Sequence, residues 1–276
     1  MRRKLIIGLC ILVVLLAGIG IYLRNGFYGN CVLERRSLYV RSGSEYRTLE
    51  DSLDAAIAHT AFFRFYARHI ELDRSFKPGH YVLEPGMNVV QVARMLKLGL
   101  QTPVRVTINN VRTPAQLAGK LARQIEADSA TIVGALTDPA TARKAGLDSV
   151  TLFSMFIPDT YEFYWTVSPA QFIERMRREY DRFWTPQRDA KRQRSGLSRL
   201  EVMTLASIVY EETRQSDEMP RIAGVYINRL RKGWPLQADP TVKYALQEFG
   251  LRRILHRHLK YPSPYNTYIN KGLPPS

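Results

Sequence analysis

The sequence is poor in the residues that bind metals or form disulfides. It has two cysteines and five histidines in 276 residues. Cys10 lies inside an apolar run and Cys31 just beyond it, so the two thiols cannot pair and no disulfide framework is expected. The histidines have no ligand spacing supported by cysteines, and His256 and His258 would point to opposite sides of a helix. We therefore expect no metal and no cofactor.

Repeats, low-complexity runs and a glycine-rich phosphate loop are also missing. The missing loop disfavours a lyase that uses pyridoxal phosphate, because such an enzyme needs a phosphate cradle and a Schiff-base lysine. With 45 % hydrophobic and 24 % charged residues, the composition is that of an ordinary globular protein. The length suits one large domain, or two modest ones plus an anchor.

An uncharged apolar run covers Leu5–Leu23. At about 1.5 Å per helical residue, it is just long enough to cross the hydrocarbon core of a bilayer. Arg2, Arg3 and Lys4 precede it and only Arg24 follows closely. The positive-inside rule then predicts a single-pass anchor in the cytoplasmic membrane, with the N-terminus in the cytoplasm and the rest on the outer, periplasmic side. The alternative is a cleaved signal peptide, although the run exceeds the usual apolar stretch of about 7–15 residues.

Acidic residues are the minority charge, since 25 of them oppose 40 lysines and arginines and leave a formal net charge of +15. A basic balance of this size suggests an anionic partner: nucleic acid, anionic lipid headgroups or anionic wall polymers. The expected topology disfavours nucleic acid. A solvated basic surface with no binding role explains the charge equally well.

The region after the anchor predicts a small α+β module at 32–102. A short flexible exit at 26–30 leads to a strand at 31–40 and a helix at 48–67. Turns at Pro78-Gly79 and Pro85-Gly86 then bracket a short strand at 80–83. A helix at 89–98 follows, and Gly99 is a good residue to end it. Units of this kind bury one sheet face under their helices.

A larger α/β region is predicted from residue 103 to the end of the chain. It begins with an alternating strand at 104–108 and helices at 113–126 and 128–137. A turn then leads into an aromatic strand within 156–164, and a basic helix follows at 169–183. The polar, basic stretch at 185–198 is the best candidate for a linker or an exposed loop.

A helix beginning after Ser198 carries the best candidate for chemistry. Ser198 and Glu201 form a capping-box pattern. At about 100° per residue, Glu212 falls beside Leu205 on the flank of an apolar stripe, while Glu211 faces the opposite side. We therefore expect Glu212 to be partly desolvated, which would raise its pKa toward the value that a general acid needs. The alternative is a rim glutamate paired with one of the many arginines.

Two further segments could complete a site. A second helix at 219–232 would form a hairpin with the first, and Asp239-Pro240 then starts another helix, with Asp239 as a simple N-cap in the alternative interpretation. The last segment, YPSPYNTYINKGLPPS, is rich in turn formers and tyrosines. Tyrosine rings stack on sugar C–H faces and asparagine amides pair with hydroxyl or N-acetyl groups, although an ordinary proline-rich loop would look similar.

Five segments in this order resemble the endolytic murein transglycosylases of the MltG (YceG-like) family. They are FIPDTY, LASIVYEET, VYINRL, LQADPTVKYAL and SPYNTYINKGLPP. The resemblance runs from about residue 37 to the end, and GHYVLEPGMNVVQVARMLKLG is similar to the LysM-like subdomain of the family. It implies an α+β fold with a transmembrane helix and exit at 1–31, a LysM-like subdomain at 32–102 and a catalytic domain with a helical-hairpin core at 103–276. The family usually continues past this point, so the catalytic domain is expected to be truncated.

The resemblance also implies a reaction. Members cleave the β-1,4 bond between N-acetylmuramic acid and N-acetylglucosamine in nascent peptidoglycan and leave a 1,6-anhydro end. The family helix reads SIVEKE and carries a catalytic glutamate. Its first glutamate becomes Tyr210 here, which removes one candidate, and its second glutamate matches Glu212. Most glycosidases need two carboxyls. Here the 6-hydroxyl of the sugar itself would be the nucleophile, and Glu212 would serve as acid and then as base.

The same resemblance supplies further expectations. The residues that match motif positions of the family, and are expected to line the groove and orient the sugars, are Gln237, Asp239, Tyr265, Asn266 and Tyr268. Peptidoglycan glycan strands would be the partner outside the membrane, and peptidoglycan synthases are further candidates. The alternative function is a non-catalytic, membrane-anchored scaffold that binds peptidoglycan.

Overall fold

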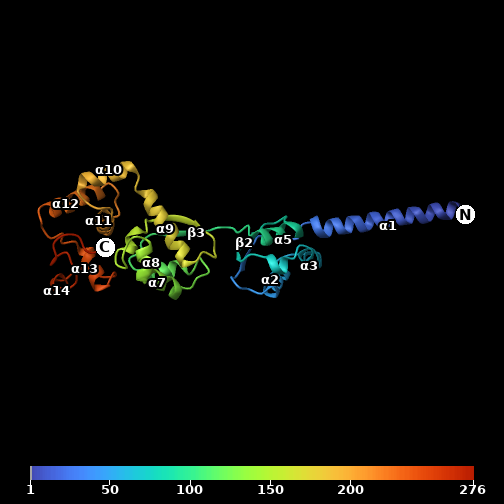
Figure 1. The fold of residues 1–276 in the computed structure, drawn as a ribbon, viewed down its shortest axis with the longest axis horizontal. Helices are drawn as coiled ribbons and strands as arrows, with labels where there is room; N and C mark the ends of the chain where they lie inside the picture. The colour runs from blue at the N-terminus through green and yellow to red at the C-terminus, as the bar shows by residue number, and fades with distance from the viewer. Residues whose placement is uncertain (1) are drawn as a thin grey trace. The chain divides into compact units, whose positions relative to one another are not determined.

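The computed structural model describes residues 2–276, and Figure 1 shows their course. Met1, the first residue of the expected cytoplasmic stub, lies outside them. The chain divides into two compact units that are described separately below. The first runs up to Val106 and includes Gln124–Glu126 and Glu162–Val167, and the second holds the remaining residues. Helices and short strands occur in both, so the expected α+β class is confirmed.

Helix α1 (Arg2–Tyr28) contains the apolar run and continues past it. Its segment Ile6–Tyr28 is long and apolar enough to cross a membrane, and the most apolar stretch within it is not buried by other parts of the chain. A signal sequence would share these properties. The flexible exit expected at 26–30 is wrong in its first residues, because the helix continues to Tyr28 and Gly26 packs against the ring of Phe62.

The first unit has a two-stranded antiparallel sheet of β1 (Arg36–Val40) and β2 (Gly79–Leu83). Arg36 pairs with Leu83 and Val40 with Gly79. Between the strands lie α2 (Tyr46–Asp54), α3 (Thr60–His69) and α4 (Leu72–Ser75), and α5 (Val89–Leu98) follows β2. Helix α5 has the predicted bounds. It ends at Gly99, which adopts the left-handed conformation that glycine tolerates best.

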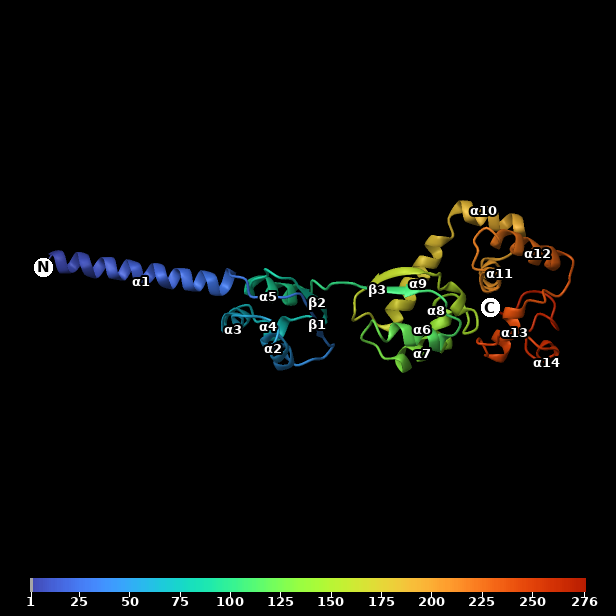
Figure 2. The same cartoon turned by 180° about the vertical axis from the view of Figure 1, so that it is seen from behind.

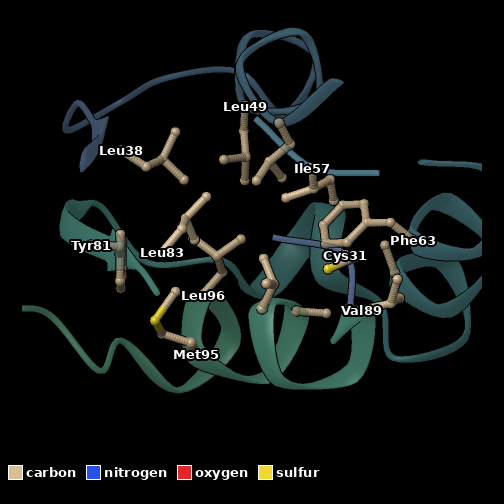
Figure 3. Packing of buried hydrophobic residues seen from close by; sticks show 14 of the residues in the cluster. Cys31, Leu38, Leu49, Ile57, Phe63, Tyr81, Leu83, Val89, Met95 and Leu96 are labelled. Atoms are coloured by element: carbon tan, nitrogen blue, oxygen red, sulfur yellow. The ribbon is translucent and has the colours of Figure 1, made fainter. Parts of the chain in front are cut away.

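Apolar side chains from both strands and from the helices form the core of this unit. Figure 3 shows Leu38 and Leu83 of the sheet facing Leu49 of α2 and Leu96 of α5. Cys31 is fully buried within the same cluster. Burial raises the pKa of its thiol to about 11, because the thiolate would lose its hydration. Cys31 is therefore a packing residue with an unreactive thiol.

The single helix expected at 48–67 is wrong, since the structure breaks it into α2 and α3. Ile57 turns into the core between them, and the amide of Ala58 donates to the carbonyl of Cys31 at 2.7 Å. His59, in a left-handed conformation, then redirects the chain into α3. Burial of Ile57 and this long-range bond outweigh the helical periodicity, which carries no information about distant contacts.

The second unit is mainly helical. Strands β3 (Val104–Ile108) and β4 (Asp159–Phe163), whose residues are divided between the two units, form a two-stranded sheet. The connection between them contains α6 (Pro114–Leu121), α7 (Ser129–Thr137), α8 (Pro139–Lys144) and a 3-10 turn, η1 (Leu152–Met155). Helix α9 (Pro169–Phe183) begins with Ser168 as a capping box and Pro169 in its first turn, and its bounds match the sequence prediction.

The expected linker at 185–198 is instead a helix, α10 (Pro186–Ser195). Thr185 caps it by accepting from the amide of Arg188, and Pro186 opens the first turn. None of its residues is buried, so the segment has no apolar stripe that periodicity could detect. Asp189 holds it to the next helix by an ion pair with Arg199, and this pair lowers the pKa of Asp189 to about 2.

The C-terminal part carries the residues of interest. Helix α11 (Arg199–Glu212) begins at the predicted capping box of Ser198 and Glu201 and packs against α12 (Met219–Arg231). Two short helices follow, α13 (Asp239–Leu246) and α14 (His256–Leu259). Figure 2 shows these elements from behind. Leu205, Ile208 and Val209 of α11 form a small core with Tyr226 of α12 and Leu236.

Candidate functional site

The two adjacent glutamates of α11 have environments opposite to those predicted. Glu212 is exposed, whereas Glu211 is half-buried, with 27 % of its side chain accessible. Arg112 donates to Glu211 at 2.8 Å and Arg214 lies 3.7 Å away. The expectation that Glu212 is the desolvated member of the pair is therefore wrong. Helical periodicity placed Glu212 beside the apolar stripe correctly, but it could not account for Arg112, which is 99 residues away in the sequence.

Glu212 is nevertheless held by one specific contact. The hydroxyl of Tyr226, on α12, donates to Glu212 Oε1 at 2.8 Å. Tyr226 is only 7 % exposed. Its burial, followed by the bond to Glu212 and the negative charge there, raises the pKa of its phenol. The phenol thus remains a donor at neutral pH, fixing one carboxylate oxygen while the exposed side chain presents the other to solvent.

A second carboxylate–tyrosine pair lies close by. The hydroxyl of Tyr268 donates to Asp239 Oδ1 at 2.7 Å. The pKa of Tyr268 rises to about 12, mainly by burial and by the bond to Asp239, with a smaller contribution from the charge of Glu212. That contribution shows that the two pairs are near enough to interact. The structure thus brings Glu212, Asp239 and Tyr268 together from three separate segments.

Asp239 does not have the capping role considered as the alternative. Ala238 occupies the N-cap of α13 and makes no side-chain cap, while Asp239 is the first helical residue. Its carboxylate is therefore available to Tyr268, and its charge still complements the positive end of the helix dipole. The sequence could not separate these two roles, because both place an aspartate before a proline.

Gln237 directly precedes the Ala238–Asp239 segment, and its backbone is hydrogen-bonded to the loop that carries Tyr268. Its amide donates to the carbonyl of Thr267 at 3.1 Å, and Arg229 of α12 contacts its Oε1 at 3.4 Å. Gln237 adopts a left-handed φ of 52°, which is costly for a residue with a Cβ. Buried Thr267 joins the two segments, since its hydroxyl bonds to Ala238 N at 3.1 Å and to the Thr241 hydroxyl at 2.8 Å.

Asn266 does not line a groove. It is fully buried, and its side-chain amide donates to the carbonyls of Leu259 and Tyr261 at 3.0 and 2.9 Å. Its Oδ1 accepts from the backbone amide of Tyr268 at 3.0 Å. All of these partners are internal, so the expected sugar contact is wrong for this residue. Asn266 instead shapes the loop that presents Tyr268.

Tyr265 lines a cavity of about 500 Å³. Its ring is 4.8 Å from that of Tyr244, and its hydroxyl is 3.2 Å from the Ser276 hydroxyl. Glu211 and Tyr210 line the same cavity, whereas Glu212 and Tyr268 do not. The five residues expected to orient sugars are therefore divided. Gln237, Asp239 and Tyr268 accompany Glu212, Tyr265 faces the cavity, and Asn266 is internal.

Sequence reasoning missed Tyr226 and Arg229. Both lie in VYINRL, within the helix predicted at 219–232, where Tyr226 falls among apolar residues. A tyrosine in such surroundings must place its hydroxyl near a polar partner when buried, and that requirement was the available signal. Among residues 2–276, no group of three or more histidine, cysteine, aspartate or glutamate side chains is placed to hold a metal ion.

The fold and the site define an α+β protein in which two carboxylate–tyrosine pairs meet beside a helix end, an arrangement suited to acid–base chemistry. Residues 38–276 match the sequence profile of the YceG-like family, and the chain belongs to that family.

Curated relatives of this chain have the name endolytic murein transglycosylase. The protein from Bacillus subtilis (strain 168) is 27 % identical over 228 residues, which are 77 % of this chain and 63 % of the relative. The protein from Streptococcus pneumoniae serotype 2 (strain D39) is 24 % identical over 270 residues, which are 86 % of this chain and 48 % of the relative. The chain thus spans about half to three fifths of the length of these relatives.

A solved structure also resembles this one. The 2.6 Å crystal structure of a YceG-like protein from Listeria monocytogenes is 27 % identical, with a TM-score of 0.57. The similarity covers 88 % of this chain and 85 % of that chain.

Proposed function

We propose that the chain is a membrane-anchored endolytic lytic transglycosylase that cleaves the β-1,4 bond between N-acetylmuramic acid and N-acetylglucosamine in peptidoglycan glycan strands. The observation that carries the proposal is the exposed Glu212 carboxylate, fixed by the buried Tyr226 hydroxyl at 2.8 Å. Membership of the YceG-like family and the names of the relatives support the same reaction.

The chemistry needs one carboxyl that changes role. Glu212 first gives its proton to the glycosidic oxygen as the bond to the anomeric carbon breaks. It then takes the proton from the 6-hydroxyl of the same muramic acid, whose oxygen bonds to that carbon and forms the 1,6-anhydro ring. The Tyr226 bond suits the second state, because a phenol donor favours a carboxylate. An intramolecular nucleophile removes the need for a second catalytic carboxyl.

In this proposal Asp239, Tyr268 and Gln237 orient the sugars. Asp239 and Tyr268 form one hydrogen-bonded unit near Glu212, and Gln237 is held beside it by Arg229. Such groups provide hydroxyl-directed hydrogen bonds and a ring for stacking. Tyr265 lines the separate cavity, so we assign it to a more distant sugar.

The remaining organisation belongs to the same proposal. Helix α1 serves as a single-pass anchor in the cytoplasmic membrane with its basic start in the cytoplasm, because that end carries three of the four flanking basic residues. Residues 1–31 would be the anchor and its exit, 32–102 a LysM-like subdomain, and 103–276 the catalytic domain around a hairpin of α11 and α12. Synthases of the same glycan are its proposed partners.

Digestion of uncrosslinked glycan by the full chain in detergent tests the activity. Mass analysis of the products should reveal ends that lack one water relative to hydrolysis, as a 1,6-anhydro end requires. Glu212→Gln should lower their yield by about 10²–10⁴-fold, which is the usual contribution of an acid–base group. Products with hydrolytic ends would contradict the reaction type. Bound but uncleaved glycan with the native chain would instead support the non-catalytic scaffold.

A further inference from the structure

The membrane helix is joined to the first unit by aromatic packing rather than by a free linker. The ring of Phe62, in α3, lies 5.3 Å from that of Tyr22 and 5.0 Å from that of Phe27, both on α1. A Cβ at Gly26 would lie only 2.3 Å from Phe62 Cζ, so this close approach requires glycine. Figures 1 and 2 both show α3 beside the end of α1.

This packing determines the depth of α3 once α1 spans a bilayer. About 20 helical residues cross the hydrocarbon core, so a span that begins at Ile6 reaches the far boundary near Asn25. Tyr22 lies just inside that boundary, where tyrosines are enriched. Because Phe62 touches Tyr22, the first turns of α3 must lie at the level where the acyl chains meet the headgroups.

The composition and exposure of α3 suit that level. Its sequence, TAFFRFYARH, has three phenylalanines, two arginines and no acidic residue. Phe65 is 67 % exposed although its ring lies only 5.9 Å from that of Phe27. Exposed Arg68, on α3, and Arg24, on α1, can reach headgroup phosphates. A helix with exposed aromatic and basic side chains and no acidic charge is typical of the membrane interface.

We propose that α3 is an interfacial helix that docks the first unit on the outer surface of the bilayer, with Phe65 in the acyl–headgroup boundary and Arg24 and Arg68 on the lipid phosphates. The inference depends on the proposed anchor but not on the proposed reaction. Its partner is the lipid surface itself. This docking limits the tilt of the first unit, so the anchor fixes an orientation as well as a location.

Spin labels on single cysteines in the full chain test the docking. The chain would be reconstituted in vesicles of phosphatidylethanolamine and phosphatidylglycerol, with Cys10→Ala removing the accessible thiol and buried Cys31 left in place. Labels would replace Phe65, Leu16 and Leu98. Leu16 lies within the span, whereas Leu98 is 66 % exposed at the far end of α5, a helix whose start lies beside Cys31.

Accessibility to oxygen and to a polar nickel chelate reports the depth of each label. We expect Leu16→Cys to be deep, Leu98→Cys to be aqueous, and Phe65→Cys to lie roughly 5–10 Å into the boundary. A label at 65 as aqueous as the one at 98, with the label at 16 still deep, would overturn the docking and leave the anchor intact. An aqueous label at 16 would overturn the anchor and the docking together. Neither result depends on glycan cleavage.

Discussion

The two faces of α11 differ in how their carboxylates are held. On one face, Glu211 is half-buried between Arg112 and Arg214 and lines a cavity with Tyr210. On the other, exposed Glu212 contacts the hydroxyl of Tyr226 and lies near the Asp239–Tyr268 pair. The two arginines contact both oxygens of the Glu211 carboxylate. A single phenol leaves one carboxylate oxygen free, so the more exposed glutamate is the better candidate for proton transfer.

The buried support behind Tyr268 should give the largest loss in stability. Asn266→Ala removes a fully buried amide and leaves the carbonyls of Leu259 and Tyr261 and the amide of Tyr268 without this partner, which costs about 2 kcal/mol of the free energy of unfolding. Thermal unfolding would measure it. Exposed Asn270 makes similar bonds to the carbonyls of Ser263 and Asn266, where water can replace it, so Asn270→Ala is the matched control. Equal losses in both variants would show that Asn266 is not a buried support.

Removing the hydrogen bond between Tyr226 and Glu212 should have the second largest effect. Tyr226→Phe removes the hydroxyl that donates to Glu212 and keeps the ring in the small core. We expect the rate of glycan cleavage to fall about 10-fold, or ~1.4 kcal/mol. Tyr210→Phe is the control from the other face, where the hydroxyl contacts Asn110 at 3.3 Å. A Tyr226→Phe enzyme with native rate and native pH profile would remove Tyr226 from the mechanism.

The ion pair on the Glu211 face should matter less. Both side chains of the Arg112–Glu211 pair keep about 30 % of their surface, so solvent screens the attraction. Glu211→Gln should cost less than about 1 kcal/mol of unfolding free energy. The more exposed Arg178–Glu174 pair, at 3.9 Å, supplies Glu174→Gln as a control with no measurable effect. A loss above 2 kcal/mol for Glu211→Gln, by chemical denaturation, would mean that the pair is a structural centre of the unit.

The smallest expected effect is a change in the stability contributed by the Tyr268 hydroxyl at high pH. The pKa of Tyr268 is raised to about 12, so the folded state keeps its phenol proton more tightly than the unfolded state. Its contribution to stability is complete below pH ~10, where an unfolded tyrosine is still protonated, and disappears as pH rises toward 12. The stability difference between native chain and Tyr268→Phe should therefore narrow over that interval. A difference that stays constant from pH 9 to 12 would contradict the raised pKa.

Local signals predicted much of this fold. The capping box at Ser198, the proline starts and Gly99 gave the beginnings or ends of α5, α9 and α11, because these signals act through a few neighbouring residues. These local signals failed where contacts with residues distant in the sequence determine the secondary structure. The helix break at Ile57 depends on Cys31, and α10 lacks the buried stripe that periodicity detects.

The candidate residues of the site could be predicted from local patterns, but their environments could not. Motif resemblance and the helical wheel both selected Glu212, and the structure brings the Asp239–Tyr268 pair near it, while Gln237 contacts Thr267 and Arg229. The environments of the two glutamates were predicted the wrong way round, because Arg112 approaches Glu211 from a segment 99 residues away. The internal role of Asn266 depends on how its loop folds back, because the two carbonyls that it contacts belong to Leu259 and Tyr261, seven and five residues earlier. A one-dimensional pattern identifies candidates, but their solvent exposure depends on which distant side chains pack against them.

Glycan cleavage by Glu212→Gln and Glu211→Gln, measured side by side on the same uncrosslinked strands, tests the central claim most directly. Each change removes one charge and keeps the shape of the side chain. The account predicts that anhydro-ended products fall by about 10²–10⁴-fold for Glu212→Gln and remain within a few-fold of native for Glu211→Gln. Loss of products with Glu211→Gln and their retention with Glu212→Gln would contradict it and move the chemistry to the cavity face of the helix.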